Sequence, residues 1–271
     1  MSYIIIIRAF RPGDETGCNK LIRDCVMSSL NATFCGMIFK EITFQSIILV
    51  SAIMFIFFEM PLTVCLLVVP VVIALIYAGT YVTFIAKLTE IDKEVVNIPR
   101  LYMSNAFSCF WVAEAFEPYL MTQQPKEIHY IVMREEQYNR ANLNFCLQAK
   151  KIIGTIGLCK SDRSDRSAWI KRLWVHEQYR RKGIASYLLN DAIQFATNTG
   201  YSCANIVASE YTEEGRDLCL RKGFELKQLY HKYILGSYIM ILMYELTYQI
   251  KPTEDDYSPK LDFGKAFLTQ F

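Results

Sequence analysis

Two long uncharged runs dominate the pattern of hydrophobic and polar positions along the chain. No Asp, Glu, Lys or Arg occurs between residues 42 and 58, or between residues 60 and 86. A membrane-spanning helix needs about 20 apolar residues, with a range of roughly 17–25. The runs therefore predict a membrane hairpin with spans at about 42–58 and 62–86 and with Glu59 to Pro61 at its tip. The alternative is a pair of soluble core helices, which seldom stay apolar all round over such lengths.

The sequence on either side of this hairpin alternates between strand-like and helical patterns. The isoleucine-rich segment 3–10 predicts a strand, and Asp14 or Thr16 can cap a helix over about 15–30. The later part of the chain predicts strands at 108–114, 151–159, 169–175, 202–208, 224–233 and 238–246, and helices at 184–199 and 212–222. Gly200 and Gly223 are placed to end the two later helices. The alternation predicts an α/β fold with a central sheet flanked by helices.

These elements suggest one domain that the apolar hairpin interrupts. We expect residues 1–33 and 91–250 to form this domain, and residues 34–90 to form the hairpin. A polar insertion at about 116–147 separates two predicted strands, and it could reshape a substrate site or be an inert surface loop. The tail at 251–271 opens with Lys-Pro-Thr-Glu-Asp-Asp, which predicts a loosely ordered segment.

Composition and cysteine spacing exclude several classes of function. The net charge of +2 provides no broad basic field, so nothing favours a nucleic-acid partner. The nine cysteines form no CxxC pair and no metal-like spacing with the three histidines. We therefore expect reduced, mostly buried thiols and no metal site. The short apolar start, with charged residues directly after it, predicts no signal peptide.

A strand, a basic turn and a helix follow one another between residues 169 and 199. The turn contains Arg180, Arg181 and Lys182, and the small residues Gly183 and Ala185 come next. The first amides of a helix lack intrahelical partners and attract anions, and small residues let a phosphate approach the backbone. The segment therefore resembles a pyrophosphate-binding site. An ordinary exposed helix start with basic residues is the alternative.

The pattern Arg180-x-x-Gly183-x-Ala185 also resembles the acetyl-coenzyme A signature of the GNAT acetyltransferases. Leu218 to Phe224 is similar to the second signature of that family, Leu-Tyr-x-x-x-Gly-Phe. The chain resembles most the camello-like N-acetyltransferases, a membrane-anchored GNAT group, through Ser108 to Glu114, Leu173 to Ala185 and the apolar insertion. This resemblance covers roughly residues 3–250 without the 116–147 insertion. It implies a GNAT fold, a mixed central sheet flanked by helices, into which a hydrophobic helical hairpin is inserted.

The resemblance implies that acetyl-CoA is the co-substrate and that its acetyl group is transferred to an acceptor amine. The acceptor would be a protein lysine, an amino terminus or a small amine such as a cysteine conjugate. The backbone of the strand end would hold the pantetheine and polarise the thioester carbonyl, and the amides of the turn would hold the pyrophosphate. The implied cofactor-binding residues are Leu173, Trp174, Val175, Arg180, Arg181, Lys182, Gly183, Ile184, Ala185 and Ser186.

The residues that would transfer protons are less well defined by the sequence. GNAT enzymes usually have a tyrosine as the acid in the second signature, and this chain has Cys219 there. Cys219 could donate a proton or could simply be a packed thiol, which is the commoner situation. Glu114, His176 and Glu210 are further candidates, and a water relay is possible. A non-catalytic GNAT-fold membrane interaction protein that retains acetyl-CoA binding is therefore the alternative function.

The fold also predicts how the hairpin crosses the membrane. The first strand and helix must pack with strands after residue 108, so the hairpin must return to the side it left, as two spans or as a re-entrant hairpin. Lys40, Lys87, Lys93 and Arg100 flank the hairpin, which predicts a cytosolic domain. We expect the protein in the endoplasmic reticulum or another endomembrane, with the sequon at Asn31 unmodified.

Overall fold

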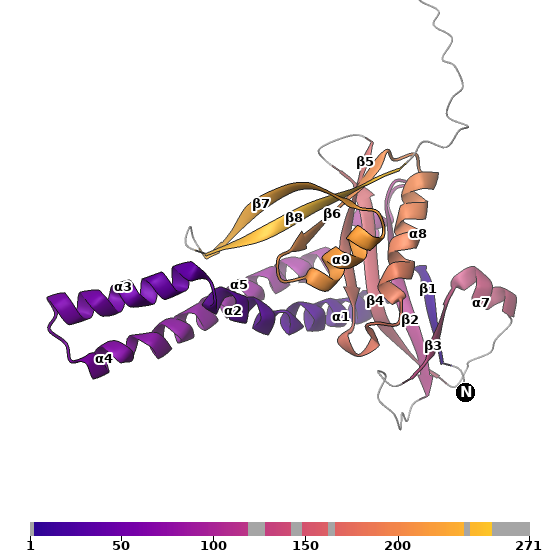
Figure 1. Cartoon of the computed structure of the whole chain (residues 1–271). Helices are drawn as coiled ribbons and strands as arrows, with labels where there is room; N and C mark the ends of the chain where they lie inside the picture. Colours follow the sequence, from indigo (N-terminus) through magenta and orange to yellow (C-terminus); the bar gives the residue numbers. More distant parts are fainter. Residues whose placement is uncertain (1–2, 119–127, 142–147, 162–165, 236–238, 251–271) are drawn as a thin grey trace, which may run out of the picture.

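The computed structural model describes residues 3–118, 128–141, 148–161, 166–235 and 239–250. Eight strands form one mixed sheet in the order β3-β1-β2-β4-β5-β6-β8-β7 (Figure 1). The strands are β1 (Tyr3–Ala9), β2 (Cys109–Pro118), β3 (Tyr130–Arg134), β4 (Gln148–Lys160), β5 (Ser167–Val175), β6 (Cys203–Ser209), β7 (Glu225–Leu235) and β8 (Ile239–Gln249). β1 pairs with β3 and β5 pairs with β6 in parallel, and the other neighbours are antiparallel. The predicted mixed sheet is confirmed.

Helices cover both faces of this sheet. They are α1 (Glu15–Ser28), α2 (Leu30–Ile38), α3 (Glu41–Phe57), α4 (Leu62–Leu66), α5 (Val68–Val96), α6 (Ile98–Tyr102), α7 (Glu135–Ala141), α8 (Ile184–Asn198) and α9 (Glu213–Arg221), with the short 3-10 helix η1 at Glu177–Tyr179. One core cluster joins α8 and α9 to one face of the sheet. A second cluster joins α1, α6 and the end of α5 to the opposite face. Gly200 and Gly223 follow α8 and α9 with φ of 81° and 88°, so the predicted left-handed helix ends are confirmed.

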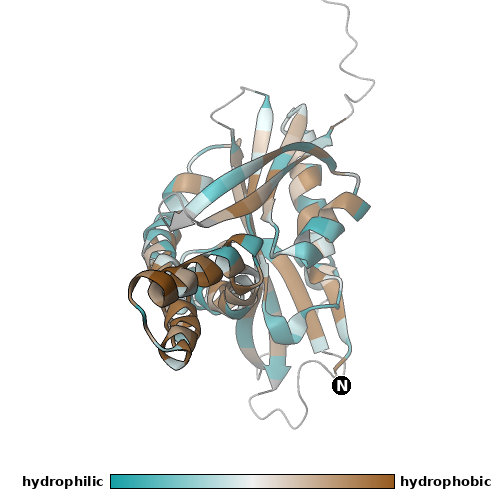
Figure 2. Cartoon of the chain, turned by 60° about the vertical axis from the view of Figure 1, so that its left-hand side comes forward, coloured by the Kyte–Doolittle hydropathy of each residue, from teal (hydrophilic) through white to brown (hydrophobic). Residues whose placement is uncertain are grey.

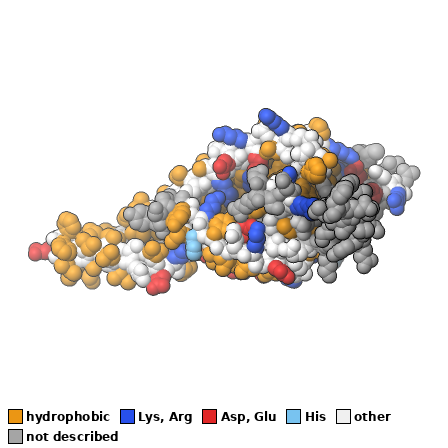
Figure 3. Space-filling model, turned by 90° about the horizontal axis from the view of Figure 1, so that it is seen from above, with side chains coloured by type: hydrophobic (Ala, Val, Ile, Leu, Met, Phe, Trp, Pro, Cys, Tyr) orange, Lys and Arg blue, Asp and Glu red, His pale blue; other side chains and the backbone are white. Residues whose placement is uncertain are grey.

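The apolar hairpin projects from the body of the protein (Figure 1). α3 forms its outgoing arm, and α4 with the consecutive α5 forms the arm that returns. Its surface is largely hydrophobic, and large apolar side chains such as Ile48, Phe57 and Leu66 are at least two-thirds exposed (Figures 2 and 3). The helix pair from Leu62 to Val96 is long and apolar enough to cross a membrane, by length and composition. A short break at Leu67 precedes Pro70, which lacks the amide that a continuous helix needs there.

The two ends of the hairpin return to the same body. Ile4 of β1, before the hairpin, pairs with Phe116 of β2, which follows it. The far half of α5 is buried against α1 and the sheet through residues such as Leu88 and Ile91. The chain bends by 56° where the helices before and after Lys40 meet. The helix predicted over 15–30 is α1, which ends at Ser28, and α2 follows after one residue.

The described residues of the insertion form regular structure. Its described residues are not an inert loop, because β3 extends the sheet beside β1 and α7 follows it directly. β3 occupies the edge of the sheet opposite to β7, and the expected reshaping of a substrate site by the insertion stays a prediction. The predicted tail at 251–271 lies outside the described residues.

Candidate acetyl-CoA site

The strand β5 carries a bulge close to its end. Thr155 of β4 pairs with Trp174 and Gly157 pairs with Lys171, so two residues of β5 oppose one residue of β4. Arg172 is one of the two, and its φ of 57° places it in the left-handed region. The Thr155 hydroxyl donates to the Arg172 carbonyl over 3.0 Å and supports this conformation. Bulges interrupt strand pairing and re-aim the backbone, and they are common beside active sites.

Beyond this bulge, β5 separates from its other neighbour. The pairing with β6 ends at Ile170 and Ile206, whereas β6 continues alongside β8 as far as Ser209. Within the described part of the chain, the backbone from Leu173 to Val175 therefore has no strand beside it on that edge. The Val175 carbonyl instead accepts hydrogen bonds from Arg180 Nε at 3.4 Å and from the Cys25 thiol at 3.6 Å.

The turn after β5 has two left-handed residues, Arg181 with φ of 65° and Gly183 with φ of 80°. Gly183 is the N-cap of α8, and the Tyr187 amide donates to its carbonyl over 3.1 Å. The amides of Ile184, Ala185 and Ser186 precede this first helical bond, so they have no partner within the helix. A side-chain carbon at Gly183 would meet only the Tyr187 ring at 3.8 Å, so the backbone is open to a ligand.

The three basic side chains of the turn, Arg180, Arg181 and Lys182, contact different parts of the protein. Arg181 Nη2 is bound to the exposed Glu214 of α9 at 3.0 Å, and Arg180 contacts the Val175 carbonyl. Lys182 Nζ donates to the carbonyl of Ile128 in the insertion. The three side chains therefore contact different elements, and the role of the turn in binding pyrophosphate stays a prediction.

Cys219 lies in the core rather than in an open site. It is on α9, only 2% of its surface is exposed, and it belongs to the same apolar cluster as α8. Burial raises the pKa of its thiol to about 11. Both observations favour the packing interpretation of Cys219.

Glu114 is held in a buried ion network at the start of α1. Arg8 Nε donates to Glu114 Oε2 at 3.1 Å, and the Arg8 guanidinium also binds both oxygens of Asp14 at 2.6 and 2.9 Å. Burial alone would raise the pKa of Asp14, but hydrogen bonds from Arg8 and the Arg11 amide outweigh it and lower that pKa. Glu114 is therefore engaged in a structural interaction on the α1 side of the sheet.

Glu210 and His176 occupy the ends of β6 and β5. Glu210 accepts from Lys40 Nζ at 2.9 Å and from the Leu242 amide at 3.3 Å, which ties the helix bend to the sheet. His176 Nδ1 accepts from the Gln178 amide at 3.3 Å. Burial and the nearby charge of Lys151 lower the pKa of His176, so its ring is neutral at neutral pH. His176 is thus an uncharged base directly after Val175.

Sequence reasoning missed two groups of residues near this site. At the bulge, Arg172 donates to Glu94 of α5, which also accepts from the Tyr102 hydroxyl at 2.7 Å. On the opposite face, Glu117 accepts from Tyr130 and Tyr179. Neither group has a local sequence signal, because its members come from segments far apart in the chain.

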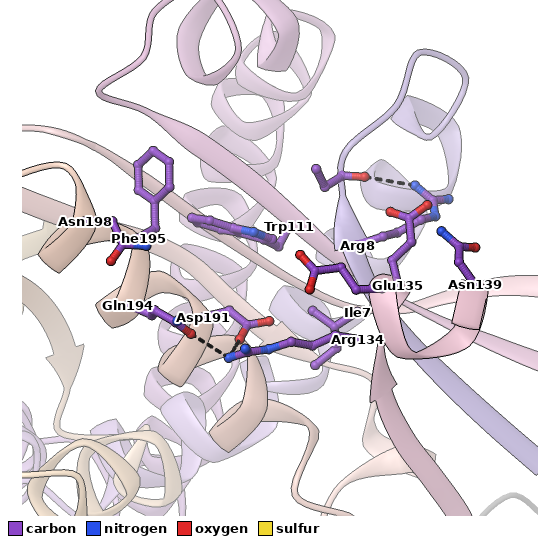
Figure 4. A pocket seen from close by; sticks show the side chains of 12 residues that line it. Ile7, Arg8, Trp111, Arg134, Glu135, Asn139, Asp191, Gln194, Phe195 and Asn198 are labelled. Carbon is purple, nitrogen blue, oxygen red and sulfur yellow. Dashed lines mark hydrogen bonds and ion pairs between the residues drawn. The ribbon is translucent and has the colours of Figure 1, made fainter. Parts of the chain in front are cut away.

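A separate open cavity of about 430 Å³ lies between α7, α8 and the first strands (Figure 4). Trp111 and Phe195 form its aromatic wall, with ring centroids 5.3 Å apart. Arg134 extends across one side and contacts Asp191 and Gln194. None of the predicted cofactor-binding or catalytic residues lines this cavity.

Comparison with known proteins agrees with the fold and the signatures. Residues 102–224 match the Acetyltransferase (GNAT) family, so the chain contains a GNAT acetyltransferase domain. The chain is 23% identical over 147 residues to "Probable N-acetyltransferase camello" from Xenopus tropicalis, which supports the resemblance to the camello-like group. The match covers 52% of each protein, so the chain spans about half the length of that curated relative.

Solved structures of GNAT acetyltransferases have lower sequence identity to this chain. An acetyltransferase from Staphylococcus aureus is 12% identical, with a TM-score of 0.42, and the match covers 89% of this chain and 98% of that one. An acetyltransferase of the family from Streptococcus pneumoniae is 16% identical, with a TM-score of 0.40, and the match covers 59% and 76% respectively.

Proposed function

We propose that this protein is a membrane-bound N-acetyltransferase that transfers acetyl from acetyl-CoA to an acceptor amine. One observation carries the proposal. A bulged strand end with a free edge leads directly into a left-handed turn and three helix amides without intrahelical partners. The strand edge suits the amide-rich pantetheine, and the helix start suits the pyrophosphate. GNAT membership supplies the reaction class.

The chemistry follows from this placement. The acceptor nitrogen attacks the thioester carbonyl, a C–N bond forms, the C–S bond breaks and CoA leaves as a thiolate. A backbone amide at the bulge, near Leu173, would stabilise the negative charge that develops on the carbonyl oxygen. The amine must also lose a proton and the thiolate must gain one. The ion-paired Glu114 and Glu210 and the buried Cys219 are unfavourable for these roles, whereas the neutral His176 is a suitable base.

A transfer assay with purified full-length protein tests this function. The protein in detergent would be mixed with acetyl-CoA and with a lysine peptide, a peptide with a free amino terminus or an S-substituted cysteine. We expect release of the CoA thiol together with acetylation of at least one amine. The alternative, a non-catalytic GNAT-fold membrane protein, predicts CoA binding by calorimetry without any transfer. Failure to bind CoA would refute both.

We also propose that the apolar hairpin enters the bilayer. α3 has 17 residues. At 1.5 Å per residue it is about 26 Å long, close to the roughly 27 Å hydrocarbon thickness of the endoplasmic reticulum. The basic residues Lys40, Lys87, Lys93 and Arg100 flank the hairpin, which favours a cytosolic site with acetyl-CoA as its soluble partner.

The proposed orientation is tested by glycosylation tags in protein made with microsomes. A tag in an extended tip near Glu59 should be modified if the hairpin forms two spans, and modification at neither the tip nor the C-terminus would indicate a re-entrant hairpin. Modification at the C-terminus would contradict the cytosolic orientation.

A further inference from the structure

Three side chains from distant segments meet beneath the turn that precedes α8. Tyr179 Oη of η1 donates to Glu117 Oε1 of β2 over 2.7 Å, and Tyr130 Oη of β3 donates to the same oxygen. Tyr179 is 1% exposed and Glu117 is 8% exposed. The two tyrosine rings are in edge contact, with centroids 5.7 Å apart. A buried carboxylate with two hydroxyl donors fixes the position of both rings.

The insertion contacts the other end of the same turn through Lys182. Lys182 Nζ donates to the buried carbonyl of Ile128 and lies over the Tyr130 ring, 5.1 Å from its centroid. Tyr179 and Lys182 bracket Arg180 and Arg181. Residues 128–130 therefore hold the turn on both sides.

The insertion is itself fixed to the domain. β3 lies beside β1 in the sheet (Figure 1). The two strands are parallel, and Tyr130 pairs with Tyr3. At the other end of β3, Arg134 contacts Asp191 and donates to Gln194 over 2.8 Å (Figure 4). The insertion thus contacts both the turn before α8 and the helix itself.

The turn needs such support because its backbone is strained. Arg181 is a non-glycine residue in the left-handed region, a conformation that persists only when the surroundings hold it. The contacts of Tyr179 and Lys182 supply that constraint from the two adjacent sides.

We propose that residues 128–134 of the insertion are a positioning element for the turn that binds the pyrophosphate. Tyr130 and Tyr179, through Glu117, set the affinity for the phosphate-bearing part of acetyl-CoA and leave the acetyl-transfer step unaffected. This inference rests on the proposed function, because it assigns a role to the same acetyl-CoA site. It places the action of the insertion on the donor site, away from the acceptor.

The test compares Tyr130→Phe and Tyr179→Phe with the parent protein. Each variant removes one hydroxyl and keeps the ring. By calorimetry, we expect each to weaken CoA binding about three- to ten-fold, a fraction of the effect of a hydrogen bond to a charged group. The KM for acetyl-CoA should rise with kcat and the acceptor KM unchanged. With S-acetylpantetheine, which lacks the pyrophosphate, kcat/KM should equal that of the parent.

Two further variants serve as controls. The Tyr3 ring packs against Tyr130, with ring centroids 5.7 Å apart. Tyr3→Phe removes the Tyr3 hydroxyl, keeps this ring and should leave CoA binding unchanged. Glu117→Gln retains one acceptor oxygen for the two tyrosine hydroxyls. Its loss of CoA affinity should lie between that of Tyr3→Phe and that of the two tyrosine variants, and thermal unfolding checks that it folds. Equal losses with acetyl-CoA and S-acetylpantetheine, or no loss with either, would overturn the positioning role while the proposed function stands. If the parent protein bound no CoA, the function itself would be wrong, and the inference with it.

Discussion

Replacing Gly183 by Asp should place a carboxylate where the pyrophosphate of acetyl-CoA is expected to bind. Two unit charges 4 Å apart repel by about 1 kcal/mol in water and by about 4 kcal/mol at an effective dielectric constant of 20. Gly183 is exposed, so the lower part of this range applies. We expect a loss of about 1–2 kcal/mol in CoA binding, which is roughly a 5- to 30-fold weaker affinity.

The backbone at Gly183 complicates this experiment and defines its control. Its φ of 80° strains any side chain, although the space beside it is open. Asn and Asp tolerate the left-handed region better than other non-glycine residues. Gly183→Asn therefore has nearly the same shape and strain as Gly183→Asp but no charge. The ratio of the two affinities isolates the electrostatic effect.

The assay is calorimetry with CoA at about 0.1 M and about 1 M salt, where the Debye length falls from roughly 10 Å to roughly 3 Å. The deficit of Gly183→Asp relative to Gly183→Asn should shrink at high salt. If both variants fold and bind CoA equally at low salt, the pyrophosphate does not bind at Gly183 and the site assignment is refuted.

Two further predictions concern residues named from the sequence. Cys219→Ser should cost about 1–3 kcal/mol in the free energy of unfolding, because a hydroxyl replaces a buried thiol, and should leave kcat unchanged; a large fall in kcat with normal CoA binding would instead make the thiol a proton donor. Asp14→Asn should cost about 2–3 kcal/mol at pH 7, because Glu114 remains as the acidic partner of Arg8 and the second carboxylate is lost. The lowered pKa of Asp14 means that the parent has this advantage above the unfolded pKa of about 3.9 and loses it as pH falls through the folded value. Urea unfolding at pH 7 and at about pH 2 measures the difference, and a pH-independent difference would contradict the ion-pair explanation.

Much of the sheet was predictable because its signals are local. The β-favouring run at 169–175 lies in a strand, and Gly200 and Gly223, which follow helical patterns, have left-handed backbones at the ends of those helices. The turn before residue 184 was predictable from its charged residues and from the small Gly183 and Ala185, whereas the left-handed φ of Gly183 is a finding of the structure. The affinity of this turn for acetyl-CoA stays a prediction.

The parts that were not predictable depend on long-range contacts. The insertion has mixed polarity, so its pattern did not indicate β3, which is stabilised by pairing with β1 from more than a hundred residues earlier. The environment of Glu114 was equally hidden, because its partner Arg8 lies in the first strand. In both cases, the sheet order determines the neighbours, and one sequence provides no direct record of that order.

The apolar hairpin and the proposed acetyl-transfer site share a single helix. Thr80 is the first buried residue of α5, and Glu94 follows it on the same helix, in contact with Arg172 at the bulge. The interval of 14 residues is about 21 Å along the helix axis. If the exposed apolar part of α5 is embedded as proposed, the bulge lies within about that distance of the membrane surface. A rigid helix holds it there, because α5 is packed against α1 over the same interval. Acetyl transfer at the bulge would therefore take place close to the membrane surface.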